Sequence, residues 1–295
     1  MIRVLGLGDN VVDDYTHIRT YYPGGNALNF SVYAKQLGCE SAYLGIIGDD
    51  EPAQHVFFVL QKLGIDQSRV RVIPGENGRA KVELRNGDRV FVGSNKGGVS
   101  RTTPYDLNQI DREYIKQFDL VHTSCHSFLD HLLPTISAWN SKLSYDFSIY
   151  FKEEHLHTIC PYIQVAELSC SHMDELEIVR RIESIHTAGC PIVIATRGLK
   201  GVVVSIKGKH YKADAYPVEV IDSMGAGDSL ITAFLIDLFS LYKQRSDYEV
   251  QGDAAMLEEF DVWFAINVNI ALTSAVMFAT KTCMKHGAFG YPKKY

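Results

Sequence analysis

The stretch that decides the fold runs from residue 220 to residue 229 and reads Val-Ile-Asp-Ser-Met-Gly-Ala-Gly-Asp-Ser. It follows an apolar segment, Pro217–Ile221, which we predict to be a strand. After it comes a helical pattern whose apolar face carries Leu230, Phe234 and Leu238. The glycine-rich stretch is therefore expected where a strand leads into a helix.

Such a junction has a defined chemistry. Backbone N–H groups at a helix N-terminus attract anions, and glycines let a phosphate approach the backbone closely. Asp228, directly after Gly227, would repel a phosphate that was merely bound. The aspartate makes sense if it removes a proton from a hydroxyl that attacks the phosphate. The alternative is a glycine-rich turn in which Asp228 only caps the helix.

The rest of the chain alternates between strand-length apolar runs and helical patterns. Predicted strands cover Val4–Gly8, Ala42–Ile47, Leu120–Thr123, Leu143–Phe147, Gln164–Leu168 and Ile192–Thr196. Predicted helices cover Ala27–Leu37, Ala53–Leu63 and Glu175–His186, each followed closely by glycine. This alternation predicts an α/β fold with a largely parallel sheet covered by helices on both faces.

Two hairpins interrupt the alternation. Residues 79–92 alternate with period two on either side of Asn86-Gly87, a pair that favours a two-residue turn, and we expect a small β lid there. A second hairpin, Gly201–Ile206 with His210–Ala213, is expected to extend the main sheet.

Composition narrows the function. The formal net charge of −6 and the lack of a dense Lys/Arg run argue against binding to nucleic acid or to a membrane surface. The six scattered cysteines have no metal-ligand spacing, so we expect reduced, mostly buried thiols in a cytoplasmic protein. The most apolar stretch, Ala265–Ala279, is interpreted as too short and too polar to span a bilayer.

The glycine-rich stretch resembles the C-terminal signature of the ribokinase-like (PfkB) carbohydrate kinases. Their N-terminal signature is matched by residues 23–30, Pro-Gly-Gly-Asn-Ala-Leu-Asn-Phe, and Gly48-Asp49-Asp50 also fits. The resemblance covers essentially the whole chain. It implies a three-layer α/β/α sandwich with a mostly parallel central sheet, formed by residues 1–295 as one kinase domain. The small β lid would come from segments near 10–25 and 79–98.

The resemblance also implies roles for single residues. Asp228 would be the general base, and the backbone of Gly225, Ala226 and Gly227 would form the anion hole for the γ-phosphate of ATP. The sugar pocket would consist of Asp9, Asp13, Gly24, Gly25 and Asn29. Each has a simpler interpretation, such as a turn residue for the two aspartates or an exposed polar residue for Asn29.

ATP phosphates would be held by Thr196, Gly198 and Gly201, which match a Thr-x-Gly-x-x-Gly element, with Asp222 ordering the catalytic loop. Arg197 and Lys200, inside that element, are interpreted more simply as solvated loop charges. Mg²⁺ is implied as a cofactor and K⁺ as a further cation. Glu175 fits the last acidic position of the family's Asn-x-x-Glu metal element, but His172 and Met173 replace its earlier residues.

Within the family, several segments are similar to fructoselysine 6-kinases, so the 6-hydroxyl of fructoselysine or a related fructosamine is the first predicted acceptor. Plain-sugar kinases of the fructokinase or ribokinase type are the alternative. A catalytically silent sugar or nucleotide sensor on the same fold is a third hypothesis. A dinucleotide-dependent oxidoreductase is rejected because Gly6-Leu7-Gly8 lacks the third glycine of that fingerprint. The exposed faces of the lid would suit a homodimer.

Overall fold

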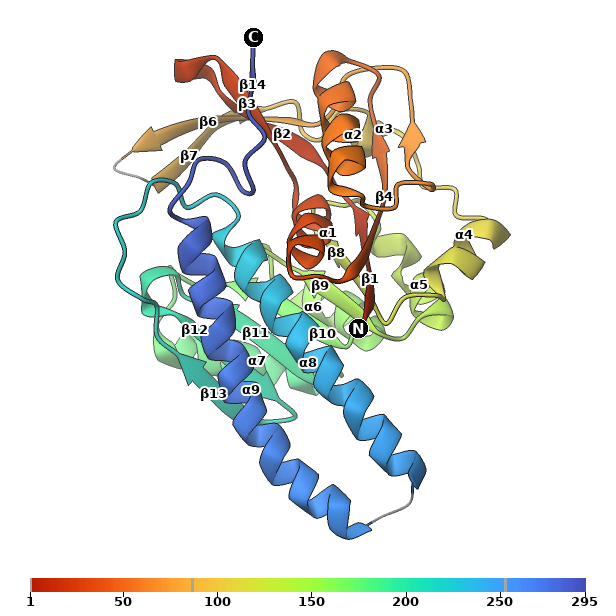
Figure 1. Cartoon of the computed structure of the whole chain (residues 1–295), viewed down its shortest axis with the longest axis vertical. Helices are drawn as coiled ribbons and strands as arrows, with labels where there is room; N and C mark the ends of the chain where they lie inside the picture. Colours follow the sequence, from red (N-terminus) through yellow and green to blue (C-terminus); the bar gives the residue numbers. More distant parts are fainter. Residues whose placement is uncertain (1, 86–87, 252–253) are drawn as a thin grey trace.

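The computed structural model describes residues 2–85, 88–251 and 254–295 (Figure 1). Within this part of the chain, the main sheet has nine strands in the order β13-β12-β11-β10-β9-β8-β1-β4-β5. The β11–β12 and β12–β13 pairs are antiparallel and the other neighbours are parallel. In chain order the strands are β1 (Arg3–Gly8), β4 (Glu40–Ile47), β5 (Arg71–Val72), β8 (Leu120–Ser124), β9 (Leu143–Asp146), β10 (Val165–Ser169), β11 (Ile192–Thr196), β12 (Val202–Ile206) and β13 (Lys209–Ala213).

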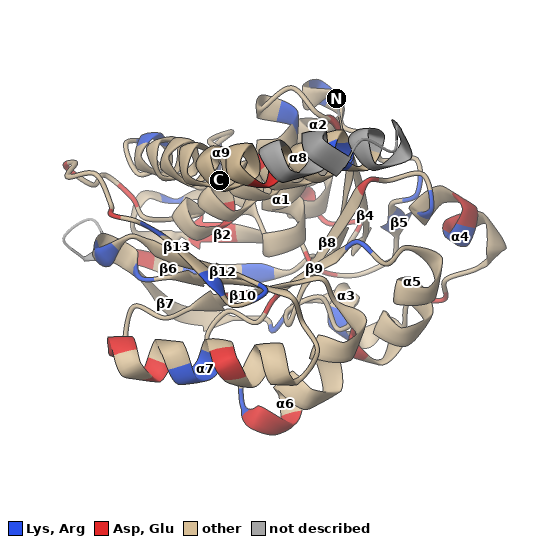
Figure 2. Cartoon of the chain, turned by 90° about the horizontal axis from the view of Figure 1, so that it is seen from below, with Lys and Arg blue, Asp and Glu red and all other residues tan. Residues whose placement is uncertain are grey.

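Helices cover both faces of this sheet, which confirms the three-layer α/β/α prediction (Figure 2). One face carries α1 (Asn26–Gln36), α8 (Ala226–Gln251) and α9 (Ala254–Thr282). The opposite face carries α4 (Gln109–Ile115), α5 (Leu133–Trp139), α6 (Glu153–Ile159) and α7 (Glu175–Thr187). The remaining helical segments are α2 (Glu51–Leu63), α3 (Val99–Thr102) and the 3-10 turns η1 (Thr16–Ile18), η2 (Asp130–Leu132), η3 (Cys160–Tyr162) and η4 (Gly198–Lys200).

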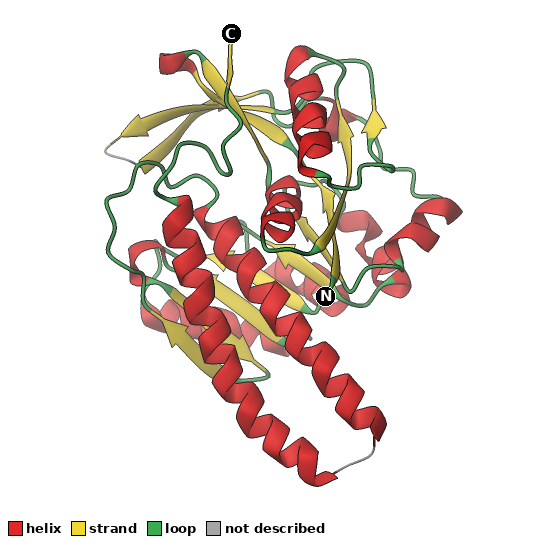
Figure 3. Cartoon of the chain, in the orientation of Figure 1, coloured by secondary structure: helices red, strands yellow, loops and turns green. Residues whose placement is uncertain are grey.

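A second, smaller sheet lies beyond the main one and is drawn at the upper end of Figure 3. Its described strands are ordered β14-β3-β2-β6-β7, and only the β2–β6 pair is parallel. They are β2 (Val11–Tyr15), β3 (Thr20–Gly24), β6 (Arg79–Arg85), β7 (Asp88–Ser94) and β14 (Lys293–Lys294). The segments predicted for the lid thus form one sheet, although the Asn86-Gly87 turn lies outside the described residues.

The C-terminal strand of this sheet was not predicted. β14 pairs with β3 through only two residues, too few for a periodic pattern to be visible in the sequence. Tyr295, which follows it, hydrogen-bonds through its hydroxyl to Asp14 at 2.7 Å. The end of the chain is therefore tied to the small sheet.

The predicted strand Pro217–Ile221 is wrong, since residues 214–225 form a loop. The backbone N–H groups of Ile221 and Asp222 both donate to the carbonyl oxygen of Cys283, at 2.9 and 3.2 Å. Proline at 217 cannot donate to a strand ladder at all. The loop is thus held by the segment after α9 instead of by a neighbouring strand.

The prediction for the most apolar stretch also needs correction. Within α9, Phe260–Thr282 is long and apolar enough to cross a membrane by length and composition alone. In this fold one side of the helix belongs to the core, where Phe264, Val268 and Leu272 pack with α8 and the main sheet. The length was underestimated because Asn267 and Asn269 interrupt the apolar run without ending the helix; each donates to the carbonyl four residues earlier.

All six cysteines are described, and none is in a disulfide. Four of them are buried, as predicted, and Cys125 and Cys283 are half-buried. The thiols of Cys160 and Cys170 have a pKa raised to about 12 by burial, so they are protonated packing groups at neutral pH.

Candidate active site

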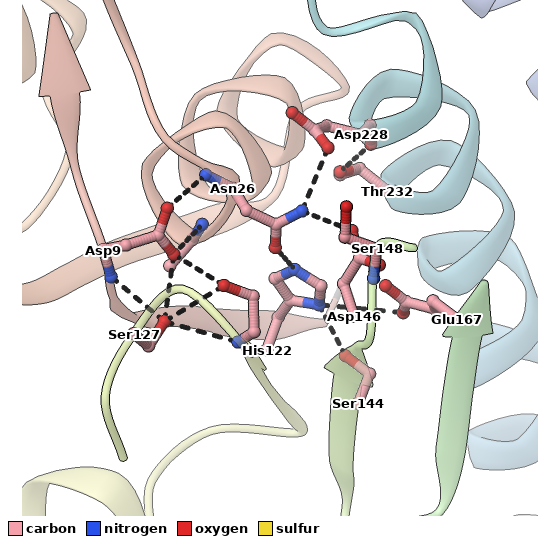
Figure 4. A network of polar contacts seen from close by, with 12 residues as sticks. Asp9, Asn26, His122, Ser127, Ser144, Asp146, Ser148, Glu167, Asp228 and Thr232 are labelled. Carbon is pink, nitrogen blue, oxygen red and sulfur yellow. Dashed lines mark hydrogen bonds and ion pairs between the residues drawn. The ribbon is translucent and has the colours of Figure 1, made fainter. Parts of the chain in front are cut away.

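The carboxyl ends of β1, β8 and β9 meet the N-termini of α1 and α8 at one edge of the main sheet (Figure 4). Ligands of open α/β sheets bind at this edge, because the loops after parallel strands gather there. Most of the predicted site residues come from these loops and helix ends. We describe them from the glycine loop outward.

The glycine loop requires glycine at position 225. Gly225 has a φ of +72°, and a Cβ atom built there would lie 2.3 Å from the hydroxyl oxygen of Tyr33. Gly227 differs, because a Cβ there would meet no described atom within 4 Å beyond its own helix and chain neighbours. α8 begins at Ala226, whose backbone N–H donates to the carbonyl of Ser223 at 3.2 Å, so the open space at this helix end lies in front of Gly227.

Asp222 holds the glycine loop in place through hydrogen bonds. Its side chain is fully buried and accepts hydrogen bonds from the backbone N–H of Met224 at 2.9 Å and of Gly287 at 2.8 Å. The hydroxyl of Tyr15, on β2, donates to the same carboxylate at 2.6 Å. One aspartate thus joins the loop, the small sheet and the C-terminal segment, and its predicted part in binding ATP stays a prediction.

Asp228 lies in the first turn of α8 and points toward α1. The side-chain amide of Asn29 donates to its Oδ2 at 2.5 Å, and that of Asn26 donates to its Oδ1 at 3.1 Å. Asn29 is buried, so the exposed-polar interpretation of this residue is wrong. The structure therefore brings the predicted base and one predicted sugar ligand into direct contact.

Asp9 has a different environment. The backbone N–H groups of Asn26 and Ala27 donate to its carboxylate at 2.7 and 3.2 Å. The hydroxyls of Ser124 and Ser127 donate to Oδ1 at 2.9 Å each. Asp9 is thus a buried anion at the N-terminus of α1, and its predicted contact with a sugar stays a prediction.

Asp13, Gly24 and Gly25 lie together where β2 pairs with β3. Asp13 is buried, and a Cβ at Gly24 would come within 2.3 Å of its Oδ2. Gly25 has a φ of +108°, and a Cβ there would lie 2.6 Å from the Cα of Asn10. Gly25 is therefore required by the backbone at the start of α1, whereas a side chain at Gly24 would displace the carboxylate of Asp13.

The Thr-x-Gly-x-x-Gly element forms the end of β11 and the turn after it. Thr196 donates through its hydroxyl to the carbonyl of Leu168 at 3.2 Å, and Gly198 and Gly201 have φ values of +58° and +80°. Lys200 is exposed, as predicted for a solvated charge. Arg197 is not, because its side chain is only 8% exposed and donates to the carbonyl of Lys200 at 2.5 Å.

The predicted metal ligand, Glu175, is the first residue of α7 and pairs with Arg197 at 3.4 Å. His172, which replaces a family ligand, stacks on Phe151 at 6.3 Å between ring centroids. Among the described residues, no group of three or more His, Cys, Asp or Glu side chains is arranged to hold a metal ion. The side chain of Glu175 is 78% exposed and thus accessible to the waters of a hydrated cation.

Below Asp228 lies a set of buried polar groups that the sequence analysis missed. Asp146 ends β9 and accepts from the Asn26 side-chain amide and the Ser148 backbone N–H, both at 2.6 Å. Burial, and then the neighbouring charge of Asp228, raise the pKa of Asp146 to about 7. Behind it Glu167 is fully buried, and no described group hydrogen-bonds to either of its oxygens. Burial raises the pKa of Glu167 well above its usual value.

His122, on β8, completes this set. Its Nε2 lies 2.7 Å from Asn26 Oδ1 and its Nδ1 lies 2.9 Å from Ser144 Oγ. Burial lowers the pKa of His122 to about 3, so the ring is neutral at physiological pH. A signal for this set existed in the sequence: Glu167 stands in the middle of a predicted buried strand, where an acidic side chain is rarely placed.

An open helix N-terminus beside a carboxylate held by two amides is suited to phosphoryl transfer to a hydroxyl. Comparisons with known proteins agree with this chemistry. The sequence profile of the pfkB family of carbohydrate kinases matches residues 3–139 and 151–247. A fructosamine kinase of Bacillus subtilis is 37% identical over 295 residues, which is 100% of this chain and 95% of the relative.

A fructoselysine 6-kinase of Escherichia coli is 30% identical over 229 residues, covering 78% of this chain and 86% of the relative. Among solved structures, a fructokinase with bound ATP from Xylella fastidiosa superposes with a TM-score of 0.74 at 16% identity, over 97% of this chain and 94% of that one. At that identity the likeness shows the fold alone, which is ribokinase-like.

Fold, site and relatives define an enzyme class, the ATP-dependent sugar kinases. More specifically, the chain belongs to the pfkB family of carbohydrate kinases. This confirms the family that the two glycine motifs predicted. Membership of this family also excludes the oxidoreductase hypothesis and favours a kinase over a catalytically silent sensor.

Proposed function

We propose that this kinase phosphorylates a fructosamine, a ketose that carries an amino-acid substituent, at its primary 6-hydroxyl. The observation that carries the proposal is the full-length match to a fructosamine kinase, supported by the match to a fructoselysine 6-kinase. Fructokinases and ribokinase are also related to this chain, but at 24–26% identity.

The residues around Asp228 have distinct roles in this reaction. Asp228 takes the proton from the 6-hydroxyl as the oxygen attacks the γ-phosphate of ATP. The N–H groups of Gly225, Ala226 and Gly227 stabilise the charge on the transferred phosphoryl group, aided by the positive end of the α8 dipole. Asp222 keeps the loop that presents them in place. Water is excluded when sugar and lid cover the edge of the sheet.

Sugar hydroxyls are held by Asp13 and Asn29, beside the backbone of Gly24 and Gly25. Asp9 already accepts four hydrogen bonds from the protein, so any contact it makes to a sugar hydroxyl is a minor one. The amino-acid substituent leaves toward the lid. We expect its amino and carboxylate groups to meet charged residues of the lid, such as Glu83 on β6; the side chains of Arg85 and Arg89, further charges of the same hairpin, lie outside the described residues.

ATP phosphates lie over Thr196, Gly198 and Gly201. Mg²⁺, when bound, would neutralise charge on the phosphates, and this ion needs few direct protein ligands. Glu175, exposed at the start of α7, would contact the waters of the hydrated ion. A monovalent cation such as K⁺ is a further component that the family resemblance implies.

The small sheet acts as the lid of this single kinase domain, and its outer surface is the proposed contact in a homodimer. Phe91 and Val92 on β7 are 56% and 46% exposed and are the apolar side chains that we assign to this contact. The protein is proposed to work in the cytoplasm, without nucleic-acid or membrane partners.

The lid is tested by hydrogen exchange, which should show new protection in β6 and β7 on saturation with sugar; no change would count against the lid.

The substrate is tested by comparing kcat/KM for fructoselysine with kcat/KM for fructose, ribose and fructose 1-phosphate, each with ATP and Mg²⁺. We expect fructoselysine to be preferred by about tenfold or more, which corresponds to roughly 1.4 kcal/mol of transition-state binding. If a plain sugar is preferred by that factor, the fructosamine assignment is wrong and the sugar-kinase assignment stands.

A further inference from the structure

We propose that Asn26 and His122 are positioning residues for the reaction: together they hold the Asp228 carboxylate in the orientation that accepts the proton. This inference rests on the proposed role of Asp228 as the base. It adds residues whose side chains are not assigned a role by the family motifs, and it is carried by contacts within the chain alone.

Asn26 lies between two carboxylates. Its Nδ2 is 3.1 Å from Asp228 Oδ1 and 2.6 Å from Asp146 Oδ2, so each of its two hydrogens has its own acceptor (Figure 4). A single amide nitrogen therefore bridges the carboxylates of Asp228 and Asp146. An amide in this place separates two acidic groups and fixes the angle at which Asp228 faces the edge of the sheet.

The orientation of Asn26 is set by His122. The amide nitrogen faces two carboxylates, so the oxygen must face the histidine, and Nε2 carries the hydrogen that this oxygen accepts. On the other side of the ring, the hydroxyl of Ser144 donates to Nδ1. Because the ring is neutral and buried, this tautomer persists across the physiological pH range. A flip of the amide would break all three of its hydrogen bonds.

Packing holds the ring in turn. His122 is 2% exposed and stacks on Phe30 of α1, with 4.5 Å between ring centroids and 22° between planes. Phe30 and Asn26 are on the same helix, so α1 and β8 together fix both partners. The other acidic groups near this set are Asp9, which accepts four hydrogen bonds, and Glu167, whose Oε1 lies 3.7 Å from His122 Nδ1.

A purely structural role for the Asn26 side chain predicts a different outcome. The start of α1 does not depend on it, because Asp9 accepts from the backbone N–H of residue 26 whatever its side chain. The side chain is half-buried, and both of its donor contacts go to carboxylates. Its removal should therefore affect the chemistry more than the folding.

The first test is Asn26→Ala in the full chain, with fructoselysine and ATP–Mg²⁺. We expect kcat to fall about 10- to 100-fold with little change in sugar KM, because a catalytic group that is slightly misplaced slows the chemical step. The acid limb of the pH profile of kcat should move to higher pH, since the Asp228 carboxylate loses one donor.

Asn140→Ala is the matched control. Asn140 also donates two hydrogen bonds through its amide, to the carbonyls of Ile115, at the end of α4, and of Phe118, in the loop after it, away from the site. This variant should keep the wild-type kcat and pH profile. The proposal is overturned if Asn26→Ala retains kcat within twofold, if its loss lies in KM alone, or if Asn140→Ala shows the same loss.

A pair of His122 variants tests the second residue. His122→Phe keeps the ring that stacks on Phe30 but removes the donor to Asn26, so kcat should fall. His122→Gln keeps a donor that reaches the Nε2 position and should recover most of the activity. Equal activity of the two variants would overturn the role of His122, provided that circular dichroism shows both to be folded.

Failure of this inference is distinguishable from failure of the proposed function. If Asp228→Asn is inactive while Asn26→Ala is fully active, the base assignment stands and the positioning role is wrong. If Asp228→Asn keeps the wild-type kcat, the base assignment itself is wrong. In the Asp228→Asn background, adding Asn26→Ala should lower kcat by less than twofold; independent, multiplying losses would contradict positioning through Asp228.

Discussion

Two helices of this kinase begin at glycines on the same edge of the sheet, and they differ in what accepts hydrogen bonds from their first turns. At α1, which follows Gly25, the carboxylate of Asp9 accepts from the first two backbone N–H groups. At α8, which follows Gly225, a Cβ at Gly227 would meet no described atom within 4 Å outside its own helix and chain neighbours. The anion site at α1 is filled by a carboxylate of the protein, whereas at α8 the N–H of Ala226 donates to the carbonyl of Ser223 at 3.2 Å and the space in front of Gly227 is open.

The comparison explains how one local chemistry serves two purposes. A helix N-terminus attracts an anion in both places. Filled by Asp9, the α1 terminus becomes a rigid support that presents Asn26 and Asn29. Left open, the α8 terminus can receive the phosphate that Asp228 needs beside it. The two helix N-termini therefore differ in function because a protein carboxylate occupies one of them and the other can take a phosphate.

Asp228→Asn should have the largest effect on the open side of this comparison. We expect kcat to fall about 10²- to 10⁴-fold, the usual range for loss of a general base, while ATP binding and the melting temperature stay close to wild type. Steady-state kinetics and thermal unfolding measure the two quantities. A variant with the wild-type kcat would remove Asp228 from the mechanism.

Gly227→Val should lower kcat about 10- to 100-fold, because a branched side chain would fill the space in front of the α8 N-terminus. The protein should still fold, since no described neighbour is displaced. Gly225→Val is the contrasting variant: it collides with Tyr33 and must adopt a positive φ, so it should lose stability as well as activity. Unchanged kinetics in folded Gly227→Val would indicate an ordinary turn.

Asp9→Asn tests the filled terminus and should act mainly on stability. The amide nitrogen cannot accept the hydrogen bonds that Asp9 now receives, so the free energy of unfolding should fall by about 3 kcal/mol. Urea denaturation measures this change. If the variant is as stable as wild type but fails to bind sugar, Asp9 is a substrate ligand and the contrast between the two helices is lost.

The buried carboxyls between the two helices should make stability depend on pH. The pKa of Asp146 is raised from 3.8 to about 7, so its favourable contribution is complete below about pH 4 and is lost as pH rises through 7. Between pH 5.5 and 7 the free energy of unfolding should fall by about 2 kcal/mol, at about 1.4 kcal/mol per pH unit. Asp146→Asn should flatten this slope; an identical slope would show that Asp146 titrates normally.

The predictions from the sequence succeeded where the pattern is local. Six predicted strands and three predicted helices of the main domain agree with the structure to within two residues at each end. Gly225 and Gly227 mark the start of α8 because glycine permits both the turn and the approach of an anion. The strand predicted before them failed because its backbone is satisfied by Cys283, more than 60 residues further along the chain.

The buried polar residues next to Asp228, which are Asn26, His122 and Asp146, could not be predicted in the same way. Asn26 meets Asp228 across 202 residues and Asp146 across 120, and no periodic pattern links such positions. His122 could not be singled out from the sequence, since its partners become visible only when β8 and β9 pair. Arg197 was interpreted as solvated, although the turn after β11 folds back over its guanidinium.

The most direct test of the contrast between the two helices is a crystal structure with ADP, aluminium fluoride and fructoselysine, in which aluminium fluoride takes the place of the transferred phosphoryl group. Our account predicts that the fluoride ligands contact the backbone N–H groups at Gly225–Gly227, with the 6-hydroxyl between the aluminium and Asp228. Asp9 should keep its contacts to α1. Aluminium fluoride bound at the N-terminus of α1, or a 6-hydroxyl directed away from Asp228, would contradict the account.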